Sequence, residues 1–313
     1  MRDRNRLSPE ARPRCAASAA FVVCALVASS FTIGRGAAGV HAAGAPGGRA
    51  EAAVEPDKYD VYAVRYATAS SFAVSGLVAG ADRGRRMDIA MMFWVLKGAD
   101  GRIALVDSGF HNERYFRQFA ITDFVSPSDA LAPLDIKPGD VTDVFLTHMH
   151  WDHAGGIDLF PSARVWVQKD EYDYYTGEAW QAARTHSGIN PDDVIEIVRR
   201  NTLGRVTLVR GDDEVSISGI AFYIGGKHTY QSQYVSVQTR DGETVVLASD
   251  NVYLYENIEM RTPIAATLDA QSNLRAQDRM RGVASSLRLI VPGHDPAVFT
   301  RFKHVTDRIV RIE

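Results

Sequence analysis

Residues 147–156 read Thr-His-Met-His-Trp-Asp-His-Ala-Gly-Gly and follow an apolar run, Val-Thr-Asp-Val-Phe-Leu, at residues 141–146. The apolar run is typical of a buried strand, and side chains along a strand alternate between its two faces. His148 and His150 are therefore expected to leave the end of this strand on the same side. Asp152 and His153 fall on the turn that follows, and the glycines after them let the chain continue into a helix packed close by. Four side chains of the metal-binding type thus converge at one strand end.

A metal site explains this convergence better than a packed core does. Three imidazoles and one carboxylate buried without partners would carry a large desolvation cost. Zinc takes about four ligands in proteins. The four side chains nevertheless suit two ions better than one, with Asp152 and His153 facing away from His148 and His150.

The pattern His-x-His-x-Asp-His after a strand resembles the signature of the metallo-β-lactamase-fold hydrolases. Three later positions resemble the remaining ligands of that family and come in its order: His228, Asp250 and His294. The resemblance covers roughly residues 58–313 and implies an α/β fold, the αβ/βα four-layer sandwich. It also implies that the Asp-Ser-Gly turn beginning at Asp107 supports the metal-binding loop.

The resemblance further implies two Zn²⁺ ions for each subunit, held by seven ligands. One ion would be bound by three histidines, the other by two histidines and an aspartate, and one further aspartate would bridge them. The first ion would be bound by His148, His150 and His228, and the second by Asp152, His153 and His294. Asp250 would bridge the two ions. Such a pair of ions lowers the pKa of a shared water and polarises a carbonyl group. The implied reaction is attack of a metal-bridging hydroxide on a lactone, ester, lactam or thioester, with Asp152 as proton shuttle.

Within this fold, the chain most resembles the N-acyl-homoserine lactonases. It shares with them the run Leu-Thr-His-x-His-x-Asp-His-Ala-Gly-Gly and a tyrosine three residues after the bridging aspartate, here Tyr253 after Asp250. The resemblance implies that Tyr253 hydrogen-bonds the substrate, with Tyr255 as the alternative for this role. We expect residues 70–86 and 174–185 to shape the acyl pocket and the partner to be a small-molecule lactone or ester.

Other members of the fold remain as alternatives. A thioesterase or a β-lactamase would use the same ligands, and a mononuclear iron persulfide dioxygenase keeps the same His/Asp motif. A metal-binding protein that has lost activity is the non-enzymatic alternative. His150 stands where diiron relatives use glutamate, which favours hydrolytic zinc. The absence of a Gly-x-Ser-x-Gly motif argues against a serine hydrolase.

The N-terminal residues differ in character from the rest of the chain. Five arginines precede an uncharged, largely apolar run at residues 15–31, and Val-His-Ala at residues 40–42 fits a signal-peptidase site. The sequence predicts a secretory signal peptide at 1–42, a flexible lead-in at 43–57 and a hydrolase domain at 58–313. The expected location is periplasmic or secreted. The alternative is a membrane anchor, although the apolar run is short for spanning a bilayer.

Cleavage after Ala42 would change both charge and redox chemistry. It removes four net positive charges, so the formal charge falls from −3 to −7, and it removes Cys15 and Cys24, the only cysteines. The mature domain then has no disulfide and no thiolate ligand. Without a basic excess, we expect no nucleic-acid partner and no stable membrane association after cleavage. The sequence leaves the oligomeric state open.

Hydrophobic periodicity predicts alternating strands and helices along the mature chain. Strands are expected at 58–68, 89–96, 102–106, 141–146, 163–167, 206–209, 214–218, 220–224, 232–239, 244–248 and 289–291. Helices are expected at 111–121, 169–175, 178–184, 192–201, 266–287 and 302–311, and a loop at 69–86.

Overall fold

The computed structural model describes residues 57–183 and 185–313. The predicted signal peptide and all but the last residue of the predicted lead-in lie outside the described residues. Among the residues described, no helix has both the length and the apolar character needed to cross a membrane.

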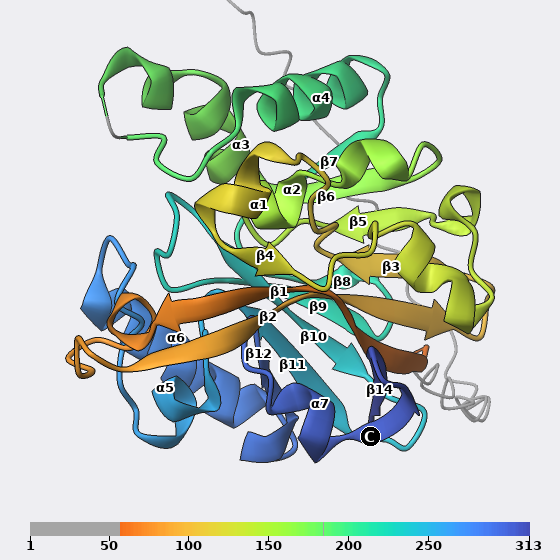
Figure 1. Cartoon of the computed structure of the whole chain (residues 1–313). Coiled ribbons are helices and arrows are strands. Elements are labelled where there is room, and N and C mark those ends of the chain that lie inside the picture. The colour runs from red at the N-terminus through yellow and green to blue at the C-terminus, as the bar shows by residue number, and fades with distance from the viewer. Residues whose placement is uncertain (1–56, 184) are drawn as a thin grey trace, which may run out of the picture. The chain divides into compact units, whose positions relative to one another are not determined.

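The described residues form four layers, in the order helix, sheet, sheet, helix (Figure 1). Helices α1 to α4 cover the outer face of one sheet, and α5 to α7 cover the outer face of the other. The helix bounds are α1 Arg114–Gln118, α2 Trp151–Ala154, α3 Lys169–Thr176, α4 Pro191–Thr202, α5 Tyr255–Glu259, α6 Ala270–Val283 and α7 Val298–Arg301. This arrangement confirms the predicted four-layer α/β sandwich.

In the described ranges, the first sheet has nine strands and the second has five. The first runs in the order β13-β14-β1-β2-β3-β5-β6-β7, with β4 beside β1, and the second in the order β12-β11-β10-β9-β8. The first sheet comprises β1 Tyr59–Ala73, β2 Arg86–Gly98, β3 Ile103–Val106, β4 Ile121–Thr122, β5 Asp143–Phe145, β6 Arg164–Gln168, β7 Val206–Val209, β13 Lys303–Thr306 and β14 Ile309–Ile312. The second comprises β8 Asp213–Ile217, β9 Ile220–Ile224, β10 Gln233–Gln238, β11 Thr244–Ser249 and β12 Ile290–Pro292.

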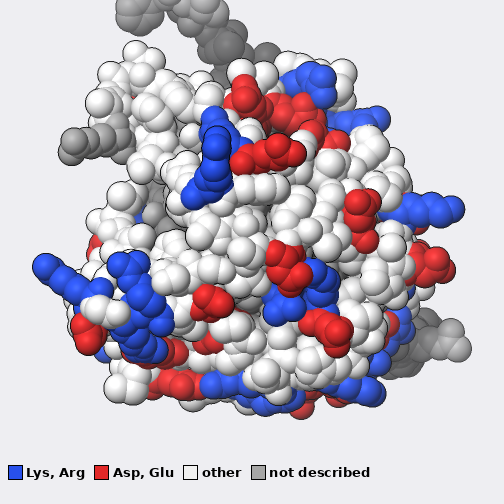
Figure 2. Space-filling model, in the orientation of Figure 1, with Lys and Arg blue, Asp and Glu red and all other residues white. Residues whose placement is uncertain are grey.

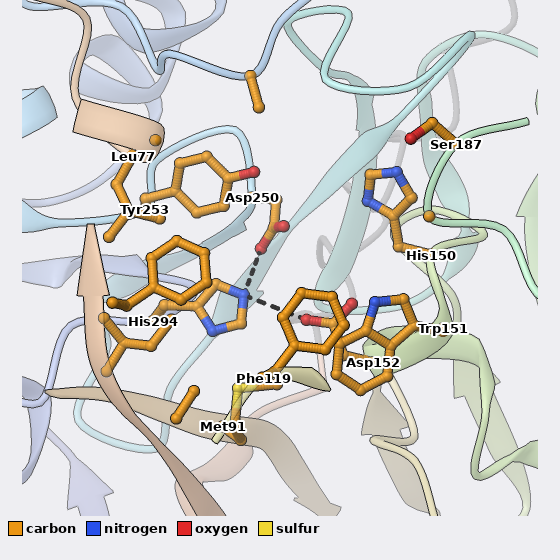
Figure 3. Close-up of a pocket in the computed structure, with 16 residues that line it drawn as sticks. Leu77, Met91, Phe119, His150, Trp151, Asp152, Ser187, Asp250, Tyr253 and His294 are labelled. Carbon is orange, nitrogen blue, oxygen red and sulfur yellow. Dashed lines mark ion pairs between the residues drawn. The ribbon is translucent and has the colours of Figure 1, made fainter. Parts of the chain in front are cut away.

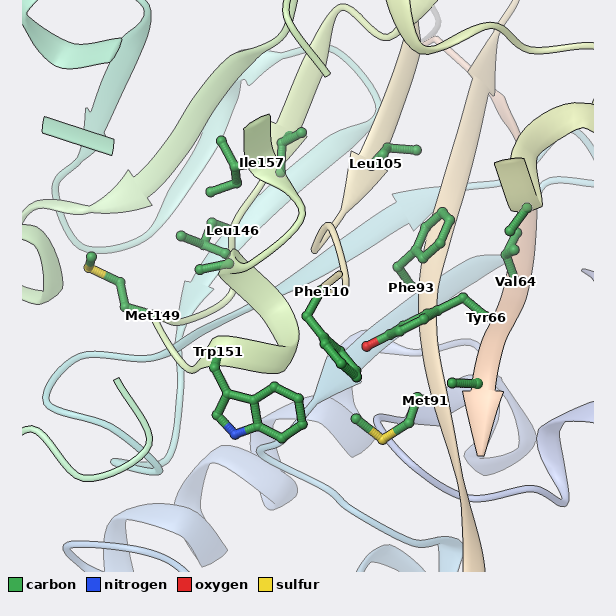
Figure 4. Close-up of a cluster of buried hydrophobic side chains, with 14 of the residues drawn as sticks. Val64, Tyr66, Met91, Phe93, Leu105, Phe110, Leu146, Met149, Trp151 and Ile157 are labelled. Atoms are coloured by element: carbon green, nitrogen blue, oxygen red, sulfur yellow. The ribbon is translucent and has the colours of Figure 1, made fainter. Parts of the chain in front are cut away.

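Strand β2 separates two hydrophobic cores. Its residues alternate, so that Met91 and Phe93 pack with the helices above the sheet, whereas Met92 and Trp94 pack against the second sheet. A strand that is buried on both faces has a continuous apolar sequence. The first of these cores gathers large aromatic and aliphatic side chains, among them Tyr66, Phe93 and Phe110, and Phe110 packs edge-on against Trp151 of α2 (Figure 4). The short helix α2, which carries two predicted ligands, therefore packs against a dense hydrophobic core.

The structure corrects several sequence predictions. The helix expected at 302–311 is wrong, because β13 and β14 form a hairpin there and β14 pairs antiparallel with β1. The β-branched residues of this segment fit a sheet edge, and short apolar runs do not distinguish the two structures. The loop expected from residue 69 begins later, because β1 continues to Ala73. The long helix starts at Ala270, capped by the Asp269 side chain, which accepts a hydrogen bond from Ser272 N.

Three smaller differences concern the helical layer. The helix predicted at 111–121 is confined to Arg114–Gln118. The helix predicted at 178–184 is a 3₁₀ turn, Glu178–Gln181. The strand expected at 141–146 is reduced to Asp143–Phe145, flanked by extended chain. Element ends depend on tertiary contacts and are therefore the least predictable part of a sequence.

Charged side chains of both signs are interspersed on the face drawn in Figure 2. Several exposed arginines pair with carboxylates, among them Arg85 with Glu256 and Arg261 with Asp278. Such exposed pairs contribute little to stability, about 0–1 kcal/mol each. This face carries no extended basic surface, and the absence of a nucleic-acid partner stays a prediction.

Candidate metal centre and active site

The seven predicted ligands come from four separate segments and meet at one edge of the two sheets. His148 and His150 follow β5, and α2 carries Asp152 and His153. His228 lies in the loop between β9 and β10, Asp250 directly follows β11, and His294 lies two residues after the end of β12. The structure therefore brings together every residue that the sequence predicted as a ligand. They form two groups, each with its ligand atoms within 4.8 Å of one another.

The first group, which we call cluster one, contains His148, His150, His228 and Asp250. His150 Nδ1 lies 3.1 Å from His148 Nε2 and 2.9 Å from His228 Nε2. Nitrogen ligands around a tetrahedral zinc ion are separated by about 3.3 Å, given Zn–N bonds of about 2.0–2.1 Å. These two separations are thus already close to those between ligands in a zinc coordination sphere.

The second group, cluster two, contains Asp152, His153 and His294. Asp152 Oδ2 lies 3.5 Å from His153 Nε2 and 3.7 Å from His294 Nε2. The other ring nitrogen of each histidine is already bonded: His153 Nδ1 donates to Asp107 Oδ2 at 2.8 Å, and His294 Nδ1 donates to Ala90 O at 3.0 Å. These bonds leave each Nε2 as the atom available for a metal, as is usual for ligating histidines.

Asp250 lies between the two clusters and turns one oxygen toward each. Its Oδ2 is 3.2 Å from His228 Nε2 and 3.7 Å from His148 Nε2. Its Oδ1 is 3.0 Å from His294 Nε2 and 3.3 Å from His153 Nε2. Asp250 Oδ1 and His153 Nε2 are buried and form no hydrogen bond. Buried polar atoms of this kind need partners, and metal ions between the clusters would supply them.

Asp107 supports the metal-binding loop, as the resemblance implied. This completely buried residue adopts the left-handed backbone conformation with φ 64°. Besides His153, its carboxylate accepts hydrogen bonds from Thr147 N at 2.8 Å and Ser249 Oγ at 2.9 Å. Asp107 therefore ties the loop after β5 to the end of β11, which carries Asp250. Sequence reasoning did not identify Ser249, whose hydroxyl completes this network.

The two clusters differ in their proton affinities. Burial lowers the pKa of both His148 and His150 well below 6.5, and neighbouring histidines lower it further. Burial also opposes protonation of His153 and His294, but nearby carboxylates, chiefly Asp250, raise the pKa of both above 6.5. His148 and His150 are thus neutral imidazoles, the form that binds metals. In cluster two, the carboxylates favour protonation of the imidazoles, so a metal ion would compete with protons there.

A cavity of about 250 Å³ opens beside the clusters. Its polar side is formed by Asp152, Asp250 and His294, with His150 nearby, as Figure 3 shows. Its other walls are largely apolar and come from β1, β2, the segment after β1, the end of α1 and the start of α2. These walls comprise Ala69, Phe72, Leu77, Ile89, Met91, Phe119 and Trp151. Residues 70–86 contribute Phe72, Gly76 and Leu77 to this cavity, and their role toward an acyl chain stays a prediction. Sequence reasoning missed Met91, Phe119 and Trp151.

A second cavity, of about 470 Å³, adjoins cluster one from another side and is lined by His150, Tyr174, Tyr175, Thr185 and His228, among others. The segment 174–185 therefore shapes this second space. Tyr174 stacks on Tyr230 with a centroid distance of 3.9 Å, which forms part of its aromatic surroundings. His150 lines both cavities, so both lie against cluster one.

Tyr253 lines the first cavity, and its hydroxyl points toward Asp250 (Figure 3). The hydroxyl is 3.4 Å from His228 Nδ1, but that nitrogen already donates to Ala266 O at 2.8 Å. The phenol proton is therefore directed at the Asp250 carboxylate rather than at His228. Burial, reinforced by the negative charge of Asp250, raises the pKa of Tyr253 well above 10, so the group stays protonated.

Tyr255, the alternative for this role, lies elsewhere. It is buried in the core between the sheets and α6, with the Arg301 guanidinium 3.7 Å from its ring centroid. It does not line the cavity beside the clusters. The structure therefore contradicts the alternative assignment and leaves Tyr253 as the candidate.

Comparison with known proteins agrees with this geometry. The sequence model of the metallo-β-lactamase superfamily matches residues 92–294. An N-acyl homoserine lactonase from a Bacillus species is 27% identical over 226 residues, which cover 68% of this chain and 84% of that protein. The N-acyl homoserine lactonase AttM from Rhizobium radiobacter is 26% identical over 182 residues, covering 56% of this chain and 66% of AttM.

Solved structures show the same fold. A quorum-quenching N-acyl homoserine lactone lactonase superposes with a TM-score of 0.63 at 21% identity, covering 77% of this chain and 93% of that one. A second hydrolase, crystallised with N-hexanoyl-L-homoserine bound at its catalytic metal centre, gives a TM-score of 0.64 at 20% identity, covering 79% and 97%. These similarities extend the agreement from the motif to the whole architecture.

Proposed function

The chain belongs to the metallo-β-lactamase superfamily and is a metal-dependent hydrolase, and we propose that it opens lactones of the N-acyl-homoserine lactone type at a pair of zinc ions. One observation carries the proposal: the two oxygens of Asp250 face two separate groups of ligands. A carboxylate in that position suits a bridge between two ions. The similarity to N-acyl homoserine lactonases supports the choice of substrate.

The ligand set fits zinc chemistry. His148, His150 and His228 would hold one ion, and Asp152, His153 and His294 would hold the other. Counting one oxygen of Asp250 on each side, both ions obtain four protein ligands of the types zinc prefers. When bound, two such ions would polarise a carbonyl group and lower the pKa of a nearby water toward neutrality.

The surrounding residues would perform the rest of the reaction. Water adds to the lactone carbonyl carbon, the ring C–O bond breaks, and the released oxygen takes up a proton to give a hydroxy acid. Asp152, which lines the cavity, is suited to carry that proton from the water to the leaving oxygen. The Tyr253 hydroxyl would donate a hydrogen bond to the oxygen on which negative charge develops.

The apolar walls support an acyl substrate. Phe72, Leu77 and Met91 would bury a hydrocarbon chain, while Phe119 and Trp151 stack on each other with a centroid distance of 4.7 Å. Each buried methylene group contributes about 0.8 kcal/mol to binding. A substrate that combines a compact polar ring with an acyl tail therefore fits a site that is polar at one end and apolar along its walls.

The decisive test combines metal analysis with a substrate panel. We expect purified protein to contain close to two equivalents of zinc, to hydrolyse N-acyl-homoserine lactones faster than thioesters or β-lactams, and to lose activity with a chelator and regain it with zinc. Asp152→Ala should abolish turnover, whereas Asp170→Ala, an exposed position in α3, serves as the matched control. One equivalent of iron with oxygen uptake would contradict the proposal, and faster thioester or β-lactam hydrolysis would contradict the substrate class.

We also propose that the protein is exported and that residues 1–42 are removed. The support is the arginine-rich start, the apolar run at 15–31 and the small residues before residue 43. N-terminal sequencing of the exported protein should find a start near residue 43. An intact Met1 in the membrane fraction would instead indicate an anchor.

A further inference from the structure

Glu171 is a buried carboxylate that the ligand set does not use. It is the third residue of α3, its exposed fraction is 0%, and within residues 57–183 and 185–313 it forms no ion pair. A carboxylate buried without compensating contacts is costly. Its contacts therefore need an explanation.

Both oxygens of Glu171 accept hydrogen bonds from backbone N–H groups of ligand-bearing loops. Met149 N donates to Oε1 at 3.1 Å, and Gln231 N donates to Oε2 at 2.6 Å. Met149 lies between His148 and His150, and Gln231 lies three residues after His228. One side chain thus links the two loops that supply all three histidines of cluster one.

The position of this link follows from the backbone. Gln233 N donates directly to Thr147 O at 2.8 Å, which joins the two loops at their base. Met149 lies two residues after Thr147, and Gln231 lies two residues before Gln233. Both residues turn their N–H groups toward the gap between the two loops. Two donors cannot bond to each other, so an acceptor with two oxygens is needed to join the loops at this level. The Glu171 carboxylate is that acceptor.

We infer that Glu171 is a positioning residue for the metal ion of cluster one, because it sets the separation of the two loops that hold His148, His150 and His228. The inference rests on the proposed two-ion site. The loops bring His150 Nδ1 and His228 Nε2 to 2.9 Å from each other, so a small opening of the gap would move one ligand out of reach. Metal coordination tolerates only a few tenths of an ångström in ligand distance.

Cluster two is supported by other contacts. Asp107 orients His153, and the carbonyl group of Ala90 orients His294. Neither contact involves α3. Loss of the Glu171 carboxylate should therefore weaken one metal site and leave the other intact, which a general loss of stability would not do.

The test compares Glu171→Gln with Glu178→Gln, the same substitution at an exposed position of the adjoining 3₁₀ turn. The amide keeps the size of the side chain but replaces one acceptor by a donor that faces another N–H. Stepwise zinc affinities are measured by chelator competition on metal-free protein, with the visible spectrum of the cobalt-substituted protein as a second readout. Outer contacts of metal sites typically change affinity by about 10- to 100-fold.

In Glu171→Gln, we expect one of the two zinc affinities to fall by about 10- to 100-fold, the cobalt bands of that site to change, and excess zinc to restore turnover. Glu178→Gln should match the parent in each measurement. If Glu171→Gln does not fold, Glu171→Asp keeps the charge on a shorter side chain and should show a smaller loss at the same site. Parent-like affinities, or an equal loss at both sites, would overturn the inference. A parent protein that binds one ion would instead overturn the two-ion proposal on which it rests.

Discussion

Both ligand clusters face Asp250, but their buried polar groups are stabilised in different ways. Cluster one surrounds its shared carboxylate oxygen with three histidines, and burial keeps His148 and His150 neutral. Cluster two adds a second carboxylate, Asp152, and its histidines attract protons strongly. Protons should therefore compete with a metal ion more strongly at cluster two than at cluster one. The difference arises from the balance between imidazoles and carboxylates within a few ångströms.

Replacing the shared ligand should have the largest effect. Asp250→Asn keeps the size but removes the charge that faces both clusters. We expect loss of at least one metal ion and a drop in activity on the order of 100-fold or more, since changes to outer contacts alone cost about 10–100-fold. Metal analysis and lactone hydrolysis provide the measurement. Full metal content with near-normal turnover would mean that the clusters do not share this residue.

Removing the hydrogen bond from His153 to Asp107 should affect zinc affinity at the two clusters unequally. In Asp107→Asn, the amide can still accept from Thr147 N, but its NH₂ group then faces the Nδ1–H of His153. We expect zinc affinity at cluster two to fall by about 10- to 100-fold, with cluster one much less affected. Stepwise zinc titration distinguishes the two sites. An equal loss at both would show that Asp107 supports the whole loop rather than His153.

Tyr253→Phe should slow the reaction without disturbing either cluster. The substitution removes only a hydroxyl group, which is not one of the seven predicted ligands. We expect kcat on lactones to fall by about 10- to 100-fold, or roughly 1.4–2.7 kcal/mol, because a donor to developing charge is lost. Zinc content should stay unchanged. Turnover at the parent rate would identify Tyr253 as a packing residue.

Acidification should weaken cluster two before cluster one. The pKa values of His153 and His294 in the metal-free site are raised above 6.5, so a metal ion must displace protons as the pH falls through those values. Affinity at cluster two should then fall by about tenfold per pH unit for each proton displaced. The pKa values of His148 and His150 are lowered, so binding at cluster one should stay constant to lower pH. Zinc titrations between pH 5 and 8 would measure this, and parallel pH profiles would contradict the comparison.

The sequence predicted some residues of the site from local spacing and others only by resemblance to a family. Four ligands lie within six consecutive residues, and the alternation of strand side chains was enough to predict that they converge. His228, Asp250 and His294 are isolated in the sequence, and only resemblance to a family assigned them. Glu171 carries no local signal, since an acid in the first turn of a helix is ordinarily a surface residue. Its role depends on two backbone groups that lie far from it in the sequence.

By itself, the sequence determined the local chemistry: the ligand types after β5, the continuous apolar character of β2 and most of the strands. These features follow from spacing and side-chain type within a few residues. Only the tertiary structure decided that residues 303–312 form a hairpin, because β14 is stabilised by pairing with β1 at the other end of the domain. It likewise decided that Asp250 faces both clusters, that Tyr253 rather than Tyr255 reaches the cavity, and that Glu171 joins two loops. Each of these outcomes depends on contacts between distant segments, which local sequence patterns do not encode.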